Sequence, residues 1–142
     1  MPRIQFQPAE RYPFATELAI YTAHINEGGH LDNVQLLTLV SEARVRWLRW
    51  LGYSQLDVEG RMFFVGDQAV QYRGEGFHGE TLRIEMAAAD LAAKGLDLVY
   101  RVTEKDSGRL VALGKIGLVC VDLASRKPGP MPEAFRQQLG AA

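Results

Sequence analysis

The chain has 142 residues, of which 47% are hydrophobic and 23% are charged, and its formal net charge is −1. This balance is that of a folded globular protein, it argues against a disordered chain or a membrane protein, and the length suits one domain over residues 1–142. Because acidic and basic residues are spread along the chain, the sequence predicts no nucleic-acid partner.

The N-terminal segment and the cysteine content favour a cytoplasmic protein without membrane contact. No apolar run approaches the roughly 18 to 20 residues of a membrane span, and MPRIQFQPAE lacks the apolar core of a signal peptide. Cys120 is the only cysteine, which excludes an intrachain disulfide and agrees with a reducing compartment. Because Cys120 lies in the apolar run GLVCVDL, we expect a buried side chain and not a nucleophile.

A strand and a long helix are predicted in the first third of the chain. Residues 17–23, ELAIYTA, alternate as a strand does, and a glycine-rich turn follows. The helix is predicted to begin at Asn33, because Asp32 occupies the N-cap position and Gln35 completes the pattern of a capping box. Gly52 is expected to end it. Apolar residues at three- and four-residue spacing predict one broad buried face: Leu36, Leu37, Val40, Ala43, Trp47, Leu48 and Leu51.

The second half predicts four long strands joined by short segments that contain glycine. These strands are expected at residues 62–73, 80–91, 96–105 and 109–123. In this order they make an antiparallel meander, to which the first strand can add an edge. The expected fold is α+β, with one long helix wrapped by a curved antiparallel sheet of about five strands. The ending KPGPMPEAFRQQL predicts an extended proline segment and one last helical turn.

Two stretches of the sequence are similar to those of a known family. GGHLDNVQLLTLVSEARVRWLRWLGYS resembles the Gly-His turn and following helix, with Glu-Ala-Arg and Leu-Gly, of the 4-hydroxybenzoyl-CoA thioesterase-like group. VQYRGEGFHGETLRIE is similar to the strand pair of that family, which carries a tyrosine and a Gly-Asp. The resemblance covers about residues 17–132, and it implies a single hotdog fold.

The resemblance also implies an activity and a missing acid. Members of the family hydrolyse the thioester of an acyl-CoA without a metal or a cofactor beyond the coenzyme A of the substrate, and they form homodimers or dimers of dimers. Much of the family uses an aspartate three residues before the turn glycine as nucleophile or general base. Gly29 matches that glycine, and Asn26 stands in the place of the aspartate. An amide cannot accept a proton at neutral pH, so that role does not transfer to Asn26.

The chemistry can be argued from the residues around the helix start. Thioester hydrolysis builds negative charge on the carbonyl oxygen, which free N–H groups at a helix start can stabilise. We expect the backbone N–H groups of Asn33 and Val34 to serve this purpose. Gly28 and Gly29 have no side chains, so substrate and backbone can approach each other closely there.

Four side chains near the helix start are candidates for the remaining roles. Asn26 and His30 are expected to position substrate or water, and Asp32 or Glu42 is expected to supply the negative group. Each candidate also has a structural alternative. Asp32 can serve only as the N-cap, Glu42 can form an ion pair with Arg46 four residues later, and the other two can hold the turn by hydrogen bonds.

Two other functions stay open at this stage. A non-catalytic hotdog protein that binds acyl thioesters would explain why position 26 carries no carboxylate. A hotdog dehydratase or hydratase would act on the same thioesters, but such enzymes resemble a different pattern, with a catalytic Asp and His on a short segment before the helix. The three histidines, His24, His30 and His78, share no metal-binding spacing, so no metal site is expected.

Overall fold

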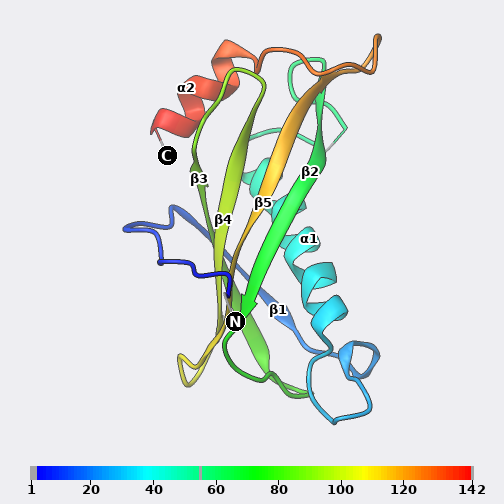
Figure 1. The fold of residues 1–142 in the computed structure, drawn as a ribbon, viewed down its shortest axis with the longest axis vertical. Helices are drawn as coiled ribbons and strands as arrows, with labels where there is room; N and C mark the ends of the chain where they lie inside the picture. The colour runs from blue at the N-terminus through cyan, green and yellow to red at the C-terminus, as the bar shows by residue number, and fades with distance from the viewer. Residues whose placement is uncertain (1–2, 55, 142) are drawn as a thin grey trace.

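A computed structural model of the protein describes residues 3–54 and 56–141 (Figure 1). Its strands are β1 (Phe14–Ala19), β2 (Arg61–Tyr72), β3 (Thr81–Ala89), β4 (Gly95–Glu104) and β5 (Leu110–Asp122). Its helices are α1 (Asn33–Trp50) and α2 (Glu133–Ala141), and a short 3-10 helix, Thr22–His24, precedes α1. No helix in this part of the chain is long and apolar enough to cross a membrane.

The five strands form one antiparallel sheet in the order β1-β3-β4-β5-β2. The predicted meander is confirmed for β3, β4 and β5, but it is wrong for β2. This strand pairs with β5, from Arg61 opposite Asp122 to Tyr72 opposite Ala112, and lies at the edge of the sheet. The connection between β2 and β3, residues 73–80, therefore crosses the end of the sheet and does not form a hairpin.

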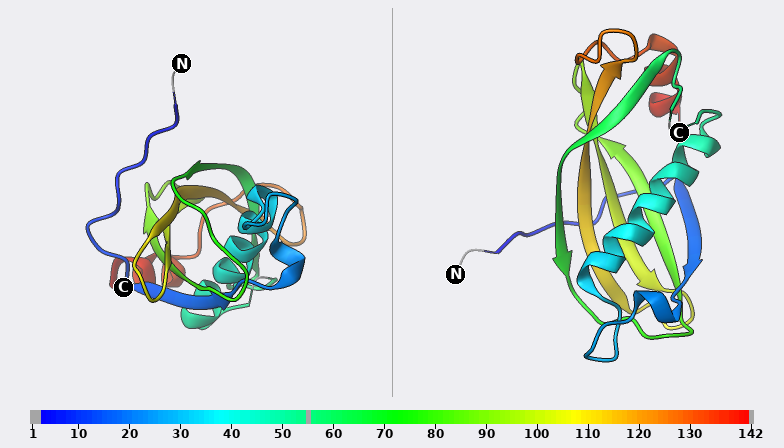
Figure 2. Two further views of the ribbon diagram at one scale, coloured as in Figure 1. Left: turned by 90° about the horizontal axis from the view of Figure 1, so that it is seen from below. Right: turned by 90° about the vertical axis from the view of Figure 1, so that its right-hand side faces the viewer.

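Helix α1 lies on the concave side of the sheet, which curls around it (Figure 2). This arrangement confirms the predicted fold of one long helix wrapped by five antiparallel strands. Leu37 was predicted to lie on the buried face of the helix, but it is only half-buried, and Leu39 lies in the core in its place. Each fully buried leucine stabilises the fold by roughly 1.5–3 kcal/mol relative to an exposed one. The buried residues of α1 are Leu36, Leu39, Val40, Ala43, Arg44, Trp47 and Leu48.

Both ends of α1 fall where the sequence predicts them, but the N-terminal capping box does not form. The Asp32 carboxylate accepts hydrogen bonds from the N–H groups of Val34, at 2.9 Å, and Gln35, at 3.2 Å. The N–H of Asp32, which the Gln35 side chain was expected to reach, already donates to the carbonyl of His24 at 2.9 Å. At the other end Gly52 has a φ of +96°, which favours glycine.

The first strand and the last helix differ from their predicted extents. β1 ends at Ala19 because Ile20 pairs with the β2–β3 connection through Glu80 and the chain then turns into the 3-10 helix. α2 runs for nine residues where one turn was predicted. Its Phe135 is fully buried, with its ring centroid 5.0 Å from that of Phe63. This aromatic contact docks α2 on the core and explains the longer helix.

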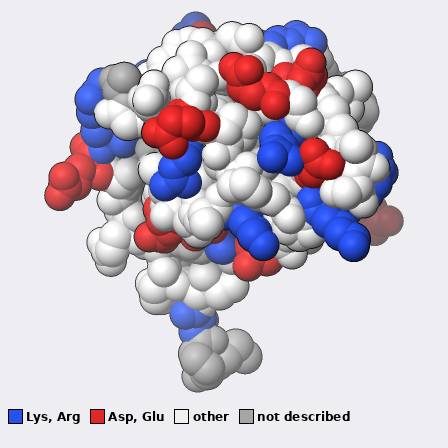
Figure 3. Space-filling model, turned by 90° about the horizontal axis from the view of Figure 1, so that it is seen from above, with Lys and Arg blue, Asp and Glu red and all other residues white. Residues whose placement is uncertain are grey.

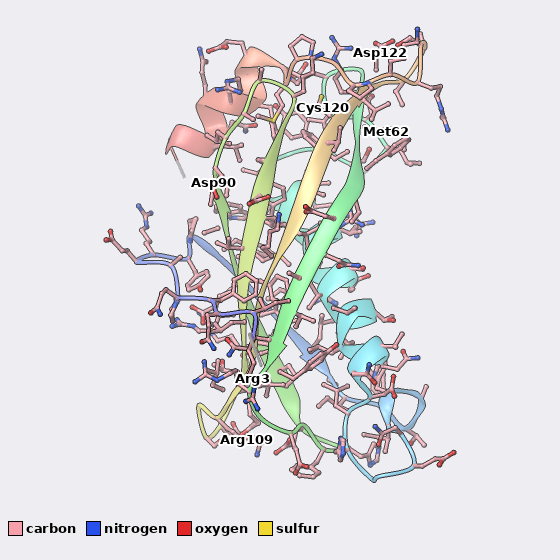
Figure 4. All side chains as sticks on the ribbon, in the orientation of Figure 1. Arg3, Met62, Asp90, Arg109, Cys120 and Asp122 are labelled. Atoms are coloured by element: carbon pink, nitrogen blue, oxygen red, sulfur yellow. The ribbon has the colours of Figure 1, made fainter. Side chains whose placement is uncertain are left out.

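Charged side chains of both signs lie on one end of the molecule, and α1 starts at the other end. On the end seen from above, charged side chains of both signs are interspersed, as is typical of a solvated surface (Figure 3). Cys120 lies near that end of β5, fully buried as predicted, and burial raises the pKa of its thiol (Figure 4). Arg109 lies at the opposite end of the sheet, before β5 begins (Figure 4). This is the end at which α1 starts.

Candidate functional site

A cavity of about 380 Å³ opens at the start of α1, and we refer to it as the helix-start cavity. Two segments form its polar wall. Residues 25–33, the helix-start turn, contribute the side chains that the sequence singled out, and the end of β2 with the β2–β3 connection contributes the others. Leu36 and Val111 form part of its apolar lining. The polar side chains of the cavity are Asn26, His30, Asp32, Asn33, Tyr72 and Glu75.

The helix-start turn is closed by its own backbone. Ile25 and Leu31 form an antiparallel bridge, and the N–H of Asn26 donates to the carbonyl of His30 at 3.0 Å. Gly29 takes a φ of +82°, a conformation that favours glycine. The Asn26 side-chain oxygen accepts the N–H of Gly28 at 2.9 Å, as asparagine does in many turns. Asn26 can therefore offer its NH₂ group to a ligand.

The side chains of Asn26 and His30 converge above Gly28. A Cβ placed on Gly28 would lie 3.1 Å from the Nε2 atom of His30 and 3.3 Å from the Oδ1 atom of Asn26. Both distances are shorter than an ordinary van der Waals contact. Glycine at position 28 therefore leaves room for the two side chains to approach each other at the cavity.

The β2–β3 connection packs directly against this turn. The N–H of Leu31 donates to the carbonyl of Gly76 at 2.7 Å. A Cβ on Gly76 would lie only 2.9 Å from the Cδ1 atom of Ile20, so glycine allows this close approach without a shift of the Ile20 side chain. The preceding residue, Glu75, then lies across from His30, with 4.0 Å between its Oε1 atom and the Nε2 atom of His30.

The contacts of His30 indicate which ring nitrogen carries the proton. Its Nδ1 atom lies 3.3 Å from the carbonyl oxygen of Leu31. A carbonyl oxygen can only accept a hydrogen bond, so Nδ1 is the donor in the neutral ring. The Nε2 atom then carries the lone pair, and it is the atom next to Glu75.

Tyr72 joins the two walls of the cavity. Its hydroxyl donates to the carbonyl of Asn33, in the first turn of α1, at 2.8 Å. Burial raises the pKa of Tyr72, and the negative charge of Asp32 adds to this effect. The tyrosine therefore stays protonated at neutral pH and acts as a hydrogen-bond donor.

The structure gathers four of the five predicted catalytic residues in one cavity: Asn26, His30, Asp32 and Asn33. Gly28 lies beneath this group, and the φ of Gly29 closes the turn. The backbone N–H of Val34 was predicted to bind the substrate, but it is not free to do so because it already donates to the Asp32 carboxylate. Asn33 is the remaining candidate for the helix-start amide.

Glu42 does not reach this cavity. It lies nine residues beyond Asn33 on α1, roughly 13 Å along the helix axis at 1.5 Å per residue. The Nε atom of Arg46 donates to its carboxylate at 2.8 Å, which is the ion pair that the spacing of the two residues allowed. Glu42 lines a separate hollow between β1 and α1, together with His24 and Thr38.

Glu75 and Tyr72 line the cavity but were not among the site residues predicted from the sequence. Both lie in the stretch VQYRGEGFHGETLRIE, whose likeness to the strand pair was recognised without a role for either side chain. The signal that could have found Glu75 is its place between Gly74 and Gly76, where a lone carboxylate is flanked by two residues without side chains. Among residues 3–54 and 56–141, no group of three or more His, Cys, Asp or Glu side chains could hold a metal ion.

Residues 21–139 match the model of a protein family described as the thioesterase-like superfamily. The match includes the helix-start turn, α1, the whole of β2 to β5 and most of α2. No curated protein matches the sequence.

Several solved structures share the fold. A 1,4-dihydroxy-2-naphthoyl-CoA thioesterase from Synechocystis is 21% identical, with a TM-score of 0.81, over 89% of this chain and 95% of that one. The protein SAV2348 from Staphylococcus aureus, solved in complex with CoA, is 19% identical, with a TM-score of 0.82, over 95% and 87%. A DHNA-CoA thioesterase from Staphylococcus aureus is 22% identical, with a TM-score of 0.77, over 89% and 86%. At these identities the likeness establishes the hotdog fold.

Proposed function

The chain belongs to the thioesterase-like superfamily, and on this premise we propose that it hydrolyses the thioester bond of an acyl-CoA in the helix-start cavity. The observation that carries the proposal is the content of this cavity. It brings the first residue of α1 together with the side chains of Asn26, His30 and Tyr72, next to the apolar residues Leu36 and Val111. Polar groups that can orient a carbonyl beside an apolar lining are what an acyl thioester requires.

The start of α1 supplies the group that polarises the thioester carbonyl. The N–H groups of Val34 and Gln35 are bound to Asp32, so the N–H of Asn33 is the donor assigned to the substrate. The dipole of the 18-residue helix stabilises negative charge at the same point. As the oxygen becomes an oxyanion in the transition state, this interaction strengthens and lowers the barrier. The NH₂ group of Asn26 is assigned to orient the substrate or the attacking water.

Glu42 and Asp32, the two carboxylates predicted to supply the negative group, are both poorly placed to accept a proton. Glu42 is held by Arg46 outside the cavity. Asp32 lines the cavity, but one of its oxygens is shared by two backbone N–H groups and secures the helix start. We therefore assign Asp32 mainly to the structure of the site, and the proton acceptor has to be found elsewhere in the cavity.

Coenzyme A enters this proposal as part of the substrate. Two structural neighbours are thioesterases, one of 1,4-dihydroxy-2-naphthoyl-CoA and one of DHNA-CoA, and a third neighbour was solved with CoA. These neighbours support a CoA thioester as the substrate class. No metal or separate cofactor is required, because a helix start can stabilise the oxyanion and a side chain can accept the proton.

The edge strand β2 supports a homodimer. Residues 64–68 of this strand are all exposed, and they include the large apolar side chains of Phe64 and Val65. An exposed edge strand with apolar side chains is a site for pairing with another chain. We assign this edge to a second copy of the protein, since pairing of identical edges closes as a two-fold dimer. A dimer of dimers would need a further interface.

Thiol release from acyl-CoA tests the proposed activity. The purified protein is incubated with short, long and aromatic acyl-CoAs, and free thiol is measured beside an Asn26→Asp variant. We expect clear turnover by the native protein with at least one acyl group, since the proton acceptor lies outside position 26. Thiol release also separates hydrolysis from hydration or dehydration, which leave the thioester intact.

A non-catalytic receptor for acyl thioesters is the second candidate, favoured by the amide of Asn26 where the family has an acid. It would bind acyl-CoA without releasing thiol. If activity appeared only in Asn26→Asp, the site would bind thioesters but lack its acid, and the receptor would be the correct function.

A further inference from the structure

Glu75 is the free carboxylate of the helix-start cavity, and it faces His30 from the other wall. Its Oε1 atom lies 4.0 Å from the Nε2 atom of His30, and among the described residues no Lys or Arg side chain lies as close to the Glu75 carboxylate. The hydrogen bond from Leu31 to Gly76 fixes the two segments against each other next to this pair. Resting on the proposed function, we propose that His30 and Glu75 together hold and activate the water that attacks the thioester.

The distance between the two acceptors suits one water molecule. At 4.0 Å, the Nε2 and Oε1 atoms are too far apart for a direct hydrogen bond. A water oxygen about 2.8 Å from each atom would see them at an angle of about 90°, close to the angle between its own two O–H bonds. Such a water donates both hydrogens to the pair, and its lone pairs then face the cavity, where the carbonyl carbon lies.

Within the pair, the Nε2 atom of His30 accepts the proton. Its Nδ1–H is directed to the carbonyl of Leu31, which leaves the lone pair on Nε2. When Nε2 takes a proton from the water, the ring becomes positive, and the carboxylate of Glu75 stabilises that charge. The missing side chain of Gly28 leaves Nε2 accessible from the cavity.

The hydrolysis balances with these groups alone. The water oxygen bonds to the carbonyl carbon as one water proton passes to Nε2 of His30, and the electron pair of the C=O double bond moves to the oxygen beside the N–H of Asn33. Collapse of this intermediate restores the C=O bond and breaks the C–S bond. The sulfur leaves with the proton from His30 as free thiol. The products are a carboxylic acid and coenzyme A, and His30 is again neutral.

The other charged or titratable groups near the pair already have partners of their own. Asp32 and Tyr72 line the same cavity, the former bound to two N–H groups and the latter to the carbonyl of Asn33. Arg109 pairs with Glu80 and feels the charge of Glu75 only at longer range. The side chain of Glu75 is 62% exposed, so its carboxylate is free to turn toward a water.

Substitution of Glu75 tests the pair. Glu75→Gln keeps the shape of the side chain and removes its charge, and we expect kcat to fall about 10²-fold while KM changes less than a few-fold. His30→Asn should lose a similar factor, and the double variant should lose little more, because the two residues act on one water. Glu27→Gln is the matched control, since Glu27 is an exposed carboxylate in the helix-start turn outside the cavity lining.

Two readouts separate chemistry from structure. In Glu75→Gln the loss should fall on kcat and not on KM, because the carboxylate acts on the attacking water and not on the binding of acyl-CoA. In Glu75→Ala, added formate or acetate should restore activity several-fold by occupying the vacated space. Equal melting temperatures for the native protein and Glu75→Gln show that the fold is retained.

The outcomes distinguish this assignment from the proposed function. If the native protein releases no thiol from any acyl-CoA, both the function and the assignment are overturned. If the native protein is active and Glu75→Gln keeps its kcat, the function stands and the His30–Glu75 pair is wrong. A loss of kcat in Glu27→Gln equal to that in Glu75→Gln would also overturn the pair, because it would show a general effect of charge.

Discussion

The hydroxyl of Tyr72 donates a 2.8 Å hydrogen bond to the backbone carbonyl of Asn33, and this bond joins the end of β2 to the first turn of α1. The two residues line opposite walls of the helix-start cavity. This hydrogen bond between a side chain and the helix backbone therefore ties the two walls together at this point.

Removal of this hydroxyl should loosen the cavity. We expect Tyr72→Phe to lower the free energy of unfolding by about 0.5–1.5 kcal/mol, the usual net contribution of one hydrogen bond. KM for acyl-CoA should rise more than kcat falls, because the hydroxyl positions the wall and takes no part in proton transfer. Urea denaturation and thiol-release kinetics measure the two effects. Unchanged values of both would show that the bond has no role in shaping the site.

Two neighbouring glycines should respond differently to the same substitution. Gly28→Ala places a Cβ 3.1 Å from Nε2 of His30, so we expect at least a tenfold loss of kcat with little loss of stability. Gly29→Ala meets no atom within 4 Å, but its φ of +82° is strained for alanine, so we expect about 1 kcal/mol lower stability and modest kinetic change. Thermal denaturation beside thiol release checks both variants. The reverse pattern would contradict the placement of His30 above Gly28.

Asp32 can be tested by separating its cap from its charge. Asp32→Ala removes both hydrogen bonds to the helix start, and we expect it to lower the free energy of unfolding by about 1 kcal/mol. Asp32→Asn keeps a side-chain oxygen for the cap, so its stability and its turnover should remain close to those of the native protein. A loss of turnover in Asp32→Asn as large as in Glu75→Gln would make Asp32 the proton acceptor instead.

The assignment of β2 to a dimer interface predicts a change of mass in solution. We expect Val65→Asp to shift the protein from dimer to monomer, since a charge on the paired edge is costly to bury. Leu91→Asp is the control, because Leu91 is 43% exposed against 44% for Val65 but lies outside β2. Light scattering on a sizing column measures the mass. A native protein that runs as a monomer would remove the basis for this interface.

Glu104 predicts how stability depends on pH. Hydrogen bonds from the N–H groups of Asp106 and Ser107 lower its pKa below the ordinary value of 4.5. A carboxyl whose pKa is lower in the folded state than in the unfolded state stabilises the protein when the pH is above the unfolded-state pKa. This contribution is lost as the pH drops through the folded-state pKa. Glu104→Gln should therefore lower the urea midpoint at pH 7, and the difference should shrink below pH 4.5. If the urea midpoints of Glu104→Gln and the native protein differed equally at pH 7 and below pH 4.5, the charge of Glu104 would not contribute to stability.

The sequence predicts best what is decided by neighbours in the chain. Asp32 and Gly52 mark the helix ends by local hydrogen bonding and backbone freedom, and both positions are confirmed. The ion pair of Glu42 with Arg46 follows from spacing on one helix, and it was foreseen as the alternative to a role in the site. The partner of β2 is decided by distant segments, and a glycine-rich connection such as residues 73–80 suits a hairpin as well as a crossover.

The site shows the same division. Asn26, His30 and Asp32 are close in sequence, so their proximity in the cavity could be predicted. Glu75 reaches His30 only because β2 lies at the far edge and its connection returns across the end of the sheet. No local pattern contains that information, and the most informative carboxylate was therefore missed.

The pairing of β2 with β5 also sets an order in time for the nascent protein. The paired residues of these two strands are about 40 to 60 positions apart, and contacts over such separations form late in folding. As the ribosome delivers the chain, the turn that carries His30 can close early, but β2 has no partner until β5 emerges. Glu75 and Tyr72 can take their places only then. A truncated chain that ends before β5 therefore lacks the complete site.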